Sequence, residues 1–521
     1  MKLNFLHLLR LSTAVLGLHA MTVSASPLVL DQPMSETQAR AMLARFGYGA
    51  TPETLSVTAG KTPLHFLDRA IAQGSTLPPE VATALDALGR GSLESLWSIY
   101  GPGGSAFSSS VAPAERLNVR RKISENGSAQ VKARLLVMAN GDNPGHEALL
   151  SFWLNHFSVF AGKGPNDLLV DDYVRSLAEA MRTDLFEALL RASFFHPAMQ
   201  IYLDNQQSVA PDSQAARQAK RNGRGRQLGI NENLARELLE LHTLGVDGGY
   251  EQQDVQELAR IITGAGIFRA DASSEKLAQA GAVRRGYFLF DPRRHDFGSK
   301  RFLDTDFPDG RGLAEVERAL HLMATHPSTA RHIATKLAQR FLDDEPAEEV
   351  VAAMAEAFRE SGGRISATLF ALIESPDFQA SLKAPKKFKE PLDYVLSVAR
   401  AVCGDHPITN AQALLVSARM MGQLPMRRRT PDGYGTQEID WLSPIAMDKR
   451  IRFAREAASG KVNFAPSVSG KGEQKSACKA DPQRIEAMLG ATRMNTLRSL
   501  VGLSPAEQST VLLTSPEFMR R

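Results

Sequence analysis

Helical periodicity runs through almost every long segment of this chain, and the alternating pattern of a half-buried strand is scarce. The first clear helix pattern is 36–46, and the same pattern returns throughout the C-terminal half, for example over 328–342. The best strand candidate is 286–290, which can form half of a small hairpin with 301–303. We therefore predict a mainly α fold with at most a small β-hairpin near residues 286–303.

The chain shows no dividing linker and no internal repeat of fixed period. Its 521 residues are enough for several average domains or one large helical domain, and a hydrophobic content of 43% suits a protein with a substantial core. Segments rich in Gly, Ser or basic residues predict flexible loops near 101–113, 208–229 and 459–480. We predict a single large helical domain over residues 26–521.

The first 25 residues have the pattern of a secretory signal peptide. Lys2 and Arg10 supply positive charge, 11–20 is a short apolar core, and Val23-Ser24-Ala25 offers the small residues that a signal peptidase recognises. A membrane anchor is the alternative, but a span needs about 20 apolar residues and this run is shorter. We expect Sec-type export and cleavage after Ala25, which places the mature protein in the periplasm or outside the cell.

Charge and cysteine content narrow the possible partners. The net charge of +4 falls to +2 when Lys2 and Arg10 are removed, which is too balanced for nucleic acid or an anionic membrane as the main partner. The basic residues within 208–229 lack interleaved aromatics, so a solvated loop explains them better than nucleic-acid binding. Cys403 and Cys478 are either a disulfide, which an oxidising compartment permits, or two free thiols.

The segment 231–250, NENLARELLELHTLGVDGGY, is the most chemically dense part of the chain. Asn231 can cap the start of a helix and Gly245 can end it in the left-handed conformation. Leucines form a stripe at every third or fourth residue, namely Leu234, Leu238 and Leu241. Opposite charges recur every four residues, at Glu232, Arg236 and Glu240. This helix is either an active-site element or a fixed polar network.

Several motifs, in this order along the chain, resemble the bacterial domain of unknown function 1800 family. They are 152–157 (FWLNHF), 231–250, 254–264, 295–300, 326–331, 386–391, 432–434 and 515–518. The resemblance covers almost the whole chain from about residue 36. Two features depart from the family pattern: Ala265 follows Gly264 where the family usually has Trp, and the basic loop and the Cys478 segment are particular to this chain.

The resemblance implies a large exported or periplasmic bacterial protein without a settled activity. Genes of this family often lie beside those of a second family that resembles alkaline phosphatases and sulfatases. A phosphatase- or sulfatase-like exported protein is therefore an expected partner.

The polar motif residues suggest one site. Imidazoles and carboxylates are ligands for Zn, Mn or non-haem Fe, so we expect a divalent metal held by His156, Glu237, His295 and Asp296. The same four residues are candidates for acid–base work, and Arg236 and Lys300 are expected to hold an anionic group. His242 lies five residues after Glu237, about 140° around an α-helix, which makes the two poor co-ligands.

Structural roles are the alternative for each of these residues. The helix charges form ordinary i, i+4 pairs, and His156 beside Trp153 and Phe157 fits a packed core histidine. Capping or surface roles suffice for His321, His326 and His332. The chain has no GxSxG motif and no Walker or Rossmann glycine pattern, which leaves a serine nucleophile and nucleotide cofactors unsupported.

Two functions remain. The first is an exported enzyme, metal-dependent and hydrolytic or oxidative, and the second is a non-catalytic helical scaffold or binding partner. A deep pocket lined by the candidate residues favours the enzyme, whereas closed salt bridges with an exposed apolar patch favour the scaffold.

Overall fold

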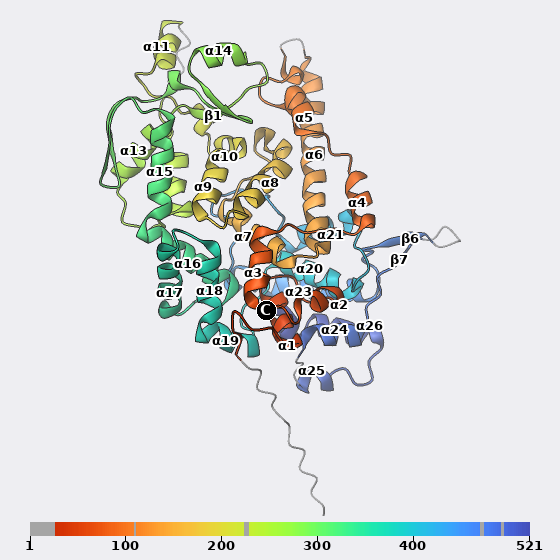
Figure 1. The fold of residues 1–521 in the computed structure, drawn as a ribbon. Coiled ribbons are helices and arrows are strands. Elements are labelled where there is room, and N and C mark those ends of the chain that lie inside the picture. Colours follow the sequence, from red (N-terminus) through yellow and green to blue (C-terminus); the bar gives the residue numbers. More distant parts are fainter. Residues whose placement is uncertain (1–26, 109–110, 223–228, 469–473, 491–493) are drawn as a thin grey trace, which may run out of the picture.

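The computed structural model describes residues 27–108, 111–222, 229–468, 474–490 and 494–521. The expected signal peptide, residues 1–25, lies outside the described residues. The fold is mainly helical, as predicted (Figure 1). Within the described residues no helix has both the length and the apolar character needed to cross a bilayer.

The helices before the strand region are, in chain order, α1 (Glu36–Arg45), α2 (Pro52–Thr58), α3 (Pro63–Ala72), α4 (Pro79–Asp86), α5 (Leu93–Tyr100), η1 (Ser105–Phe107), α6 (Pro113–Asn140), α7 (Pro144–His156), η2 (Gly164–Leu168), α8 (Val170–Met181), α9 (Phe186–Phe194), α10 (Pro197–Tyr202), η3 (Asn205–Gln207), α11 (Gln214–Arg221), α12 (Asn233–Glu237), η4 (Leu238–His242) and α13 (Gln252–Ile261). Two of the predicted flexible loops therefore contain short helices, η1 in 101–113 and α11 in 208–229.

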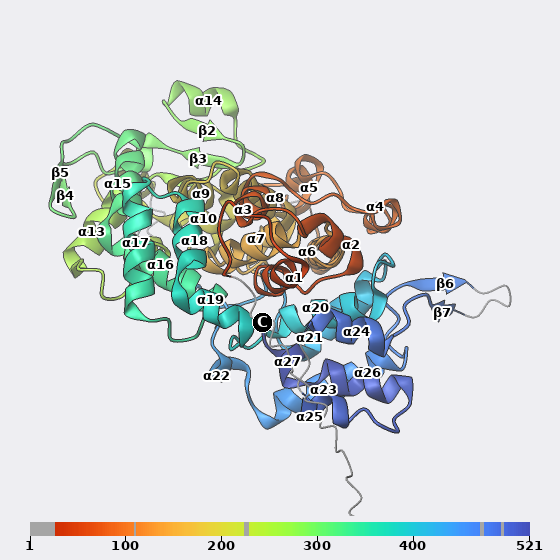
Figure 2. The same ribbon diagram turned by 60° about the horizontal axis from the view of Figure 1, so that its bottom comes forward.

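The remaining helices are α14 (Ser274–Gln279), η5 (Pro292–Arg294), α15 (Leu313–Thr325), α16 (Pro327–Phe341), α17 (Glu348–Glu360), α18 (Ile365–Glu374), α19 (Pro376–Lys383), α20 (Pro391–Cys403), α21 (Ala411–Met421), α22 (Glu438–Trp441), α23 (Pro444–Ala458), α24 (Pro482–Leu489), α25 (Met494–Arg498), α26 (Pro505–Leu513) and α27 (Pro516–Met519). Figure 2 shows the C-terminal helices, in blue, gathered beneath the N-terminal ones.

Local signals start many of these helices. Ser or Thr accepts a backbone hydrogen bond just before a proline in the first turn, as at Thr51-Pro52, Thr62-Pro63 and Ser375-Pro376. The side-chain oxygen satisfies a free N–H, and the proline ring presets the helical φ angle. Asn143 caps α7 in the same way, which positions the helix that carries the FWLNHF motif.

Two large apolar cores hold the helices together. The first joins α1, α3, α7–α10, the central segment 234–244 and α15–α18, and the second joins α6, α20, α21, α23 and the C-terminal helices. Every residue of α20 is buried, so this helix forms the centre of the second core. Residues of α7 and α16 lie where the two cores approach each other, and the candidate site forms there.

The strands of the described residues form three small antiparallel sheets. The first has the order β1 (Ala265–Ile267), β3 (Phe288–Phe290), β2 (Val283–Arg285), the second pairs β4 (Lys300–Phe302) with β5 (Thr305–Phe307), and the third pairs β6 (Pro466–Val468) with β7 (Gln474–Ser476). The predicted strand at 286–290 is confirmed over its last three residues.

The predicted pairing of that strand with 301–303 is wrong, because β4 pairs with β5 instead. Leu303 and Asp304 both have positive φ angles, 46° and 55°, which is the two-residue turn that joins adjacent antiparallel strands. This local hairpin closes a much shorter loop than pairing with 286–290 would, so its closure costs less chain entropy.

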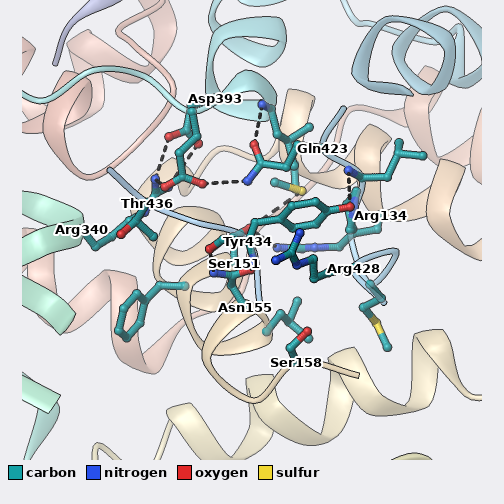
Figure 3. A pocket seen from close by; sticks show the side chains of 18 residues that line it. Arg134, Ser151, Asn155, Ser158, Arg340, Asp393, Gln423, Arg428, Tyr434 and Thr436 are labelled. Carbon is teal, nitrogen blue, oxygen red and sulfur yellow. Dashed lines mark hydrogen bonds and ion pairs between the residues drawn. The ribbon is translucent and has the colours of Figure 1, made fainter. Parts of the chain in front are cut away.

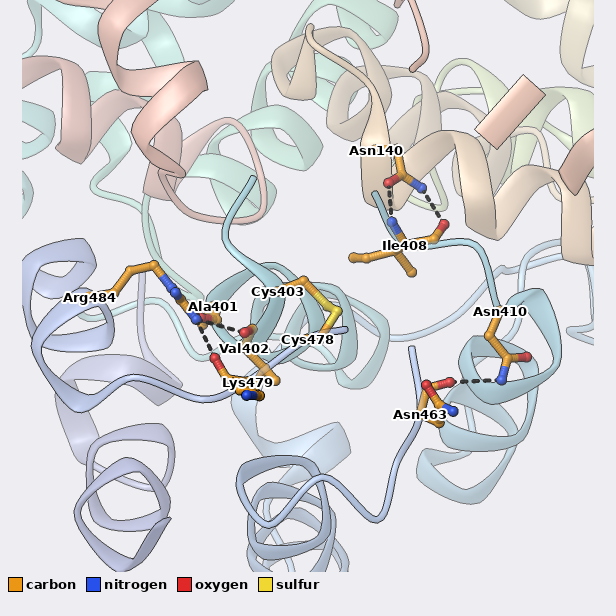
Figure 4. The surroundings of a disulfide bond; sticks show 10 residues. All are labelled: Asn140, Ala401, Val402, Cys403, Ile408, Asn410, Asn463, Cys478, Lys479 and Arg484. Atoms are coloured by element: carbon orange, nitrogen blue, oxygen red, sulfur yellow. Dashed lines mark hydrogen bonds between the residues drawn. A yellow bond between two sulfur atoms is a disulfide. The ribbon is translucent and has the colours of Figure 1, made fainter. Parts of the chain in front are cut away.

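Cys403 and Cys478 form a disulfide between the end of α20 and the segment after β7 (Figure 4). Next to it Arg484 donates to the carbonyl oxygens of Val402 and Lys479, at 2.7 and 2.6 Å. The predicted flexible loop 459–480 is therefore anchored near its C-terminal end to α20, the most buried helix of the second core.

Candidate functional site

The FWLNHF motif of α7 holds the loop formed by residues 423–436, called the 423–436 loop below. Asn155 donates to the carbonyl of Tyr434 at 2.9 Å and accepts from its backbone N–H at 2.7 Å. Gly433 has a φ of +74°, and a Cβ there would lie 2.4 Å from the Asn155 carbonyl oxygen, so only glycine fits. Tyr202 adds a second brace by donating to the carbonyl of Arg429 at 2.8 Å.

The central segment is not the continuous α-helix that we predicted over 231–244. The α-helical part is α12, and residues 238–242 then form the π turn η4. Asn231 accepts from the N–H of Asn233 at 2.9 Å, and Gly245 ends the segment at a φ of +88°, so both predicted end signals are confirmed. Of the predicted leucine stripe, Leu234 and Leu238 are buried and Leu241 is partly exposed.

The π turn leaves carbonyl oxygens that accept from histidines of two other helices. His156 of α7 contacts the carbonyl of His242 through Nε2 at 3.1 Å, and His332 of α16 contacts that of Leu241 at 3.1 Å. A carbonyl oxygen only accepts, so Nε2 of both rings carries the proton and Nδ1 presents a lone pair. Single π turns occur frequently at functional sites.

These contacts gather His156, His242, His332 and Lys336, which we call the histidine–lysine cluster. The ring centroids of His156 lie 6.1 Å from those of both His242 and His332. His156 and His242 are buried. Among the described residues, Nδ1 of His156 and both ring nitrogens of His242 have no hydrogen-bond partner.

Burial and the charge of Lys336 keep the three imidazoles neutral. They lower the pKa of His242 to about 3 and that of His332 to about 4, and they hold the pKa of His156 well below its ordinary value. Burial also lowers the pKa of Lys336 itself, with the charge of Asp432 acting in the opposite direction. Within the described part of the chain the Lys336 side chain makes no hydrogen bond and no ion pair.

Asp432 of the 423–436 loop acts electrostatically on both Glu237 and Lys336. Burial and the neighbouring Glu240 raise the pKa of Glu237 to about 7. Its carboxyl has no hydrogen bond or ion pair with any described residue. We call the Glu237 carboxyl, the Lys336 amine and the His242 ring the open groups. Asp432, in contrast, is bound by Arg428 at 3.1 Å.

A pocket with a cavity volume of about 60 Å³, partly open to solvent, lies beside the cluster between α7, α16, the start of α20 and the 423–436 loop (Figure 3). The charged groups that form its floor are already paired with protein groups. Arg340 binds Asp393 at 2.8 Å, and Gln423 donates to Glu390 at 2.7 Å. Figure 3 shows the Tyr434 ring across the middle of the pocket. The floor holds the walls in place, while apolar walls and the Tyr434 ring offer a surface for a small molecule.

One face of α16 links the pocket to the cluster. His332, Lys336 and Arg340 recur every four residues, so their side chains follow one another along the helix about 6 Å apart. This polar row is the signal that our sequence interpretation missed when it assigned His332 a capping or surface role. His326 does cap α16, as its ring accepts from the N–H of Ser328. His242 was set aside on α-helical geometry, which does not apply in a π turn.

His295 and Lys300 lie together, but around a different carboxylate. Glu315 of α15 binds Nε2 of His295 at 2.6 Å and Nζ of Lys300 at 2.9 Å, and all three side chains are buried. Nζ of Lys300 also donates to the carbonyls of Asp296 and Gly298, at 2.6 and 2.9 Å. All three N–H groups of Lys300 are thus occupied, which leaves it no donor for the anionic group that we expected it to hold.

The remaining predicted residues are also paired. Asp296 accepts from Arg260 at 2.9 Å, and Arg236 binds Glu232 at 3.2 Å, as the predicted charge ladder requires. The structure brings His295, Asp296 and Lys300 together, and it places His156 and Glu237 in another region. Among the described residues no three His, Cys, Asp or Glu side chains are arranged to hold a metal ion, so the metal hypothesis stays a prediction.

The buried Glu315 and the predicted site residue Arg236 are expected to differ sharply in their effect on stability. Glu315→Gln leaves His295 and Lys300 without their buried carboxylate, which is expected to lower the free energy of unfolding by about 3–5 kcal/mol. Arg236→Gln removes an exposed pair and is expected to change it by less than about 1 kcal/mol. Urea unfolding at pH 7 measures both, and a similar loss in the two variants would contradict the closed-network interpretation.

The family described as "Protein of unknown function (DUF1800)" matches residues 41–520. None of the curated proteins or solved structures compared with the chain matches it. The matched range contains both halves of the candidate site, from α7 to the 423–436 loop. The match covers nearly the whole chain, and the protein therefore belongs to the DUF1800 family.

Proposed function

We propose that this protein is an exported enzyme that carries out acid–base chemistry on a small polar substrate, where α7, η4, α16 and the 423–436 loop meet. The observation that carries the proposal is the gathering of the three open groups, at Glu237, Lys336 and His242, in one region. An unsatisfied buried polar group costs about 1–3 kcal/mol. His242 is buried without a hydrogen-bond partner among the described residues, and the half-buried side chains of Glu237 and Lys336 also have none there, which indicates that a ligand completes these groups.

The proposed roles follow from the chemistry of each group. Glu237, with a pKa of about 7, can both take and give a proton at neutral pH, which suits a general acid or base. His156 and His332 hold the π turn and fix which ring nitrogens carry protons. The pocket beside Arg340 and Tyr434 would receive the part of the substrate that does not react.

Two observations support export. The charge and apolar pattern of residues 1–25 is that of a signal peptide. The Cys403–Cys478 disulfide suits an oxidising compartment such as the periplasm.

A second candidate function is a non-catalytic partner for a phosphatase- or sulfatase-like exported protein. Its support is the apolar surface at α22 and the start of α23, where Ile439 and Ile445 are 83% and 71% exposed and Leu442 lies between them. Exposed apolar groups that gather in this way often mark protein interfaces.

Replacing the proposed acid–base group is expected to cause the substrate to accumulate. Strains that carry Glu237→Gln in place of the natural protein should show the same change in periplasmic small molecules as a deletion strain, measured by untargeted mass spectrometry. Glu232→Gln, just before the same helix and in an exposed pair, is the matched control and should resemble the natural strain. A Glu237→Gln strain with a natural profile, beside a deletion strain with an altered one, would refute the role of Glu237.

The pKa of Glu237 also predicts a pH-dependent stability difference. Folding raises this pKa from 4.5 to about 7, so the folded state holds the proton more tightly. The stability that Glu237 contributes is therefore complete below pH 4.5 and is lost as the pH rises through 7. Glu237→Gln removes this loss. Because the group is half-exposed, we expect the unfolding free energy of the variant, relative to that of the natural protein, to rise by about 1 kcal/mol from pH 5 to pH 8.

Urea unfolding of both proteins at the two pH values measures this difference. The groups that act on Glu237, namely Arg236, Glu240 and Asp432, are the same in both proteins, so their own titration largely cancels. If the two proteins differ in unfolding free energy by the same amount at pH 5 and at pH 8, Glu237 has an ordinary pKa.

A further inference from the structure

We propose that Lys336 is the nucleophile of this site and that the substrate is an aldehyde or ketone, which the Lys336 amine captures as an imine. The inference rests on the proposed function, because it assigns a substrate class to the same site. It adds a covalent step and a residue that our sequence interpretation did not nominate.

The surroundings of Lys336 separate it from the other buried lysines. Lys300 is bound by Glu315, and Lys387 is bound by Asp344 and by the carbonyl of Thr436. Lys389 likewise has no ion pair or side-chain hydrogen bond with a described residue, but its amine lies over the ring of Phe518, at 4.3 Å from the ring centroid. Lys336 is half-buried and, in the part of the chain that the structure describes, has neither a carboxylate partner nor an acceptor for its N–H groups.

Burial favours the neutral amine. Burial lowers the pKa of Lys336, and the one carboxylate that opposes this, Asp432, is itself bound to Arg428 and Thr430. Desolvation without a bound counter-charge is how proteins prepare lysines for Schiff-base chemistry. At neutral pH Lys336 therefore holds a larger fraction of unprotonated amine than a surface lysine does.

The groups around Lys336 can complete the reaction. The amine lone pair attacks the carbonyl carbon, a C–N bond forms, and the oxygen takes a proton to give a carbinolamine. Nitrogen gives up one N–H proton as the carbinolamine forms. Its second N–H proton leaves with the hydroxyl group as water when the C=N bond forms, so both protons end on the released water. His242 is neutral and its ring has one N–H and one lone pair, so it can give and take these protons.

A bound anion or metal ion fits the cluster less well. Nδ1 of His156 and one nitrogen of His242 present lone pairs, which repel an anion. Among the described residues no three His, Cys, Asp or Glu side chains are arranged to hold a metal cation. A neutral electrophile that reacts with an amine meets neither obstacle.

Reductive trapping tests the inference. The full mature protein is mixed at pH 7 with acetaldehyde and sodium cyanoborohydride, which reduces an imine to a stable secondary amine. Peptide mapping by mass spectrometry then locates the added mass. Because a lowered pKa leaves more free amine at pH 7, we expect Lys336 to be labelled several-fold faster than exposed lysines such as Lys122 and Lys449.

Three variants make the result specific. Lys336→Arg keeps the positive charge, so it should lose the fast labelling and still unfold at the same temperature as the natural protein. Lys449→Arg should keep the fast labelling of Lys336. Equal labelling of all lysines, or fast labelling that survives in Lys336→Arg, would overturn the inference. Glu237→Gln should still be labelled, because imine formation does not require Glu237.

The two proposals can therefore fail separately. Fast labelling of Lys336 together with a natural metabolite profile in Glu237→Gln refutes the acid–base role of Glu237 alone. An altered profile without labelling refutes the imine alone. Binding of inorganic phosphate that is lost in Lys336→Met, without any trapped imine, would assign Lys336 to anion binding and overturn the carbonyl substrate.

Discussion

Two imidazole hydrogen bonds to the π turn hold together parts of the chain that are far apart in sequence. Buried backbone carbonyls need donors, and in η4 those of Leu241 and His242 obtain them from His332 of α16 and His156 of α7. The two bonds dock the central segment between helices that lie 86 and 91 residues away along the chain. They also fix the protonated nitrogen of each ring, so the chemistry of the cluster depends on the same contacts as its packing.

The chain contains closed and open polar groups, and the distinction separates structural from functional candidates. Around Glu315 every N–H group of the Lys300 amine has an acceptor, which suits a permanent part of the fold. The open groups at Glu237, Lys336 and His242 differ in that no described residue completes them. Natural proteins retain such locally unfavourable groups mostly at functional sites, where a ligand compensates for them.

The helices and one strand could be predicted because their signals are local. Caps such as Thr51 and Ser375 and the glycine at 245 act within one turn of the residue concerned. The partner of 288–290 could not be predicted, because strand pairing depends on which loops close. The sequence analysis identified part of the site, because two of its candidates, His156 and Glu237, lie there. His242 and His332 were misjudged because the π turn is set by tertiary contacts and leaves no mark in the periodicity.

The stability of Lys336→Met is the measurement that tests the central claim most directly. If Lys336 is an open group kept for function, replacing its charge with an apolar side chain removes an unfavourable burial, and we predict a gain of about 1 kcal/mol in unfolding free energy at pH 7. If Lys336 instead belongs to a closed structural network like that of Lys300, the variant will lose several kcal/mol. That loss would contradict the assignment of the histidine–lysine cluster as a functional site.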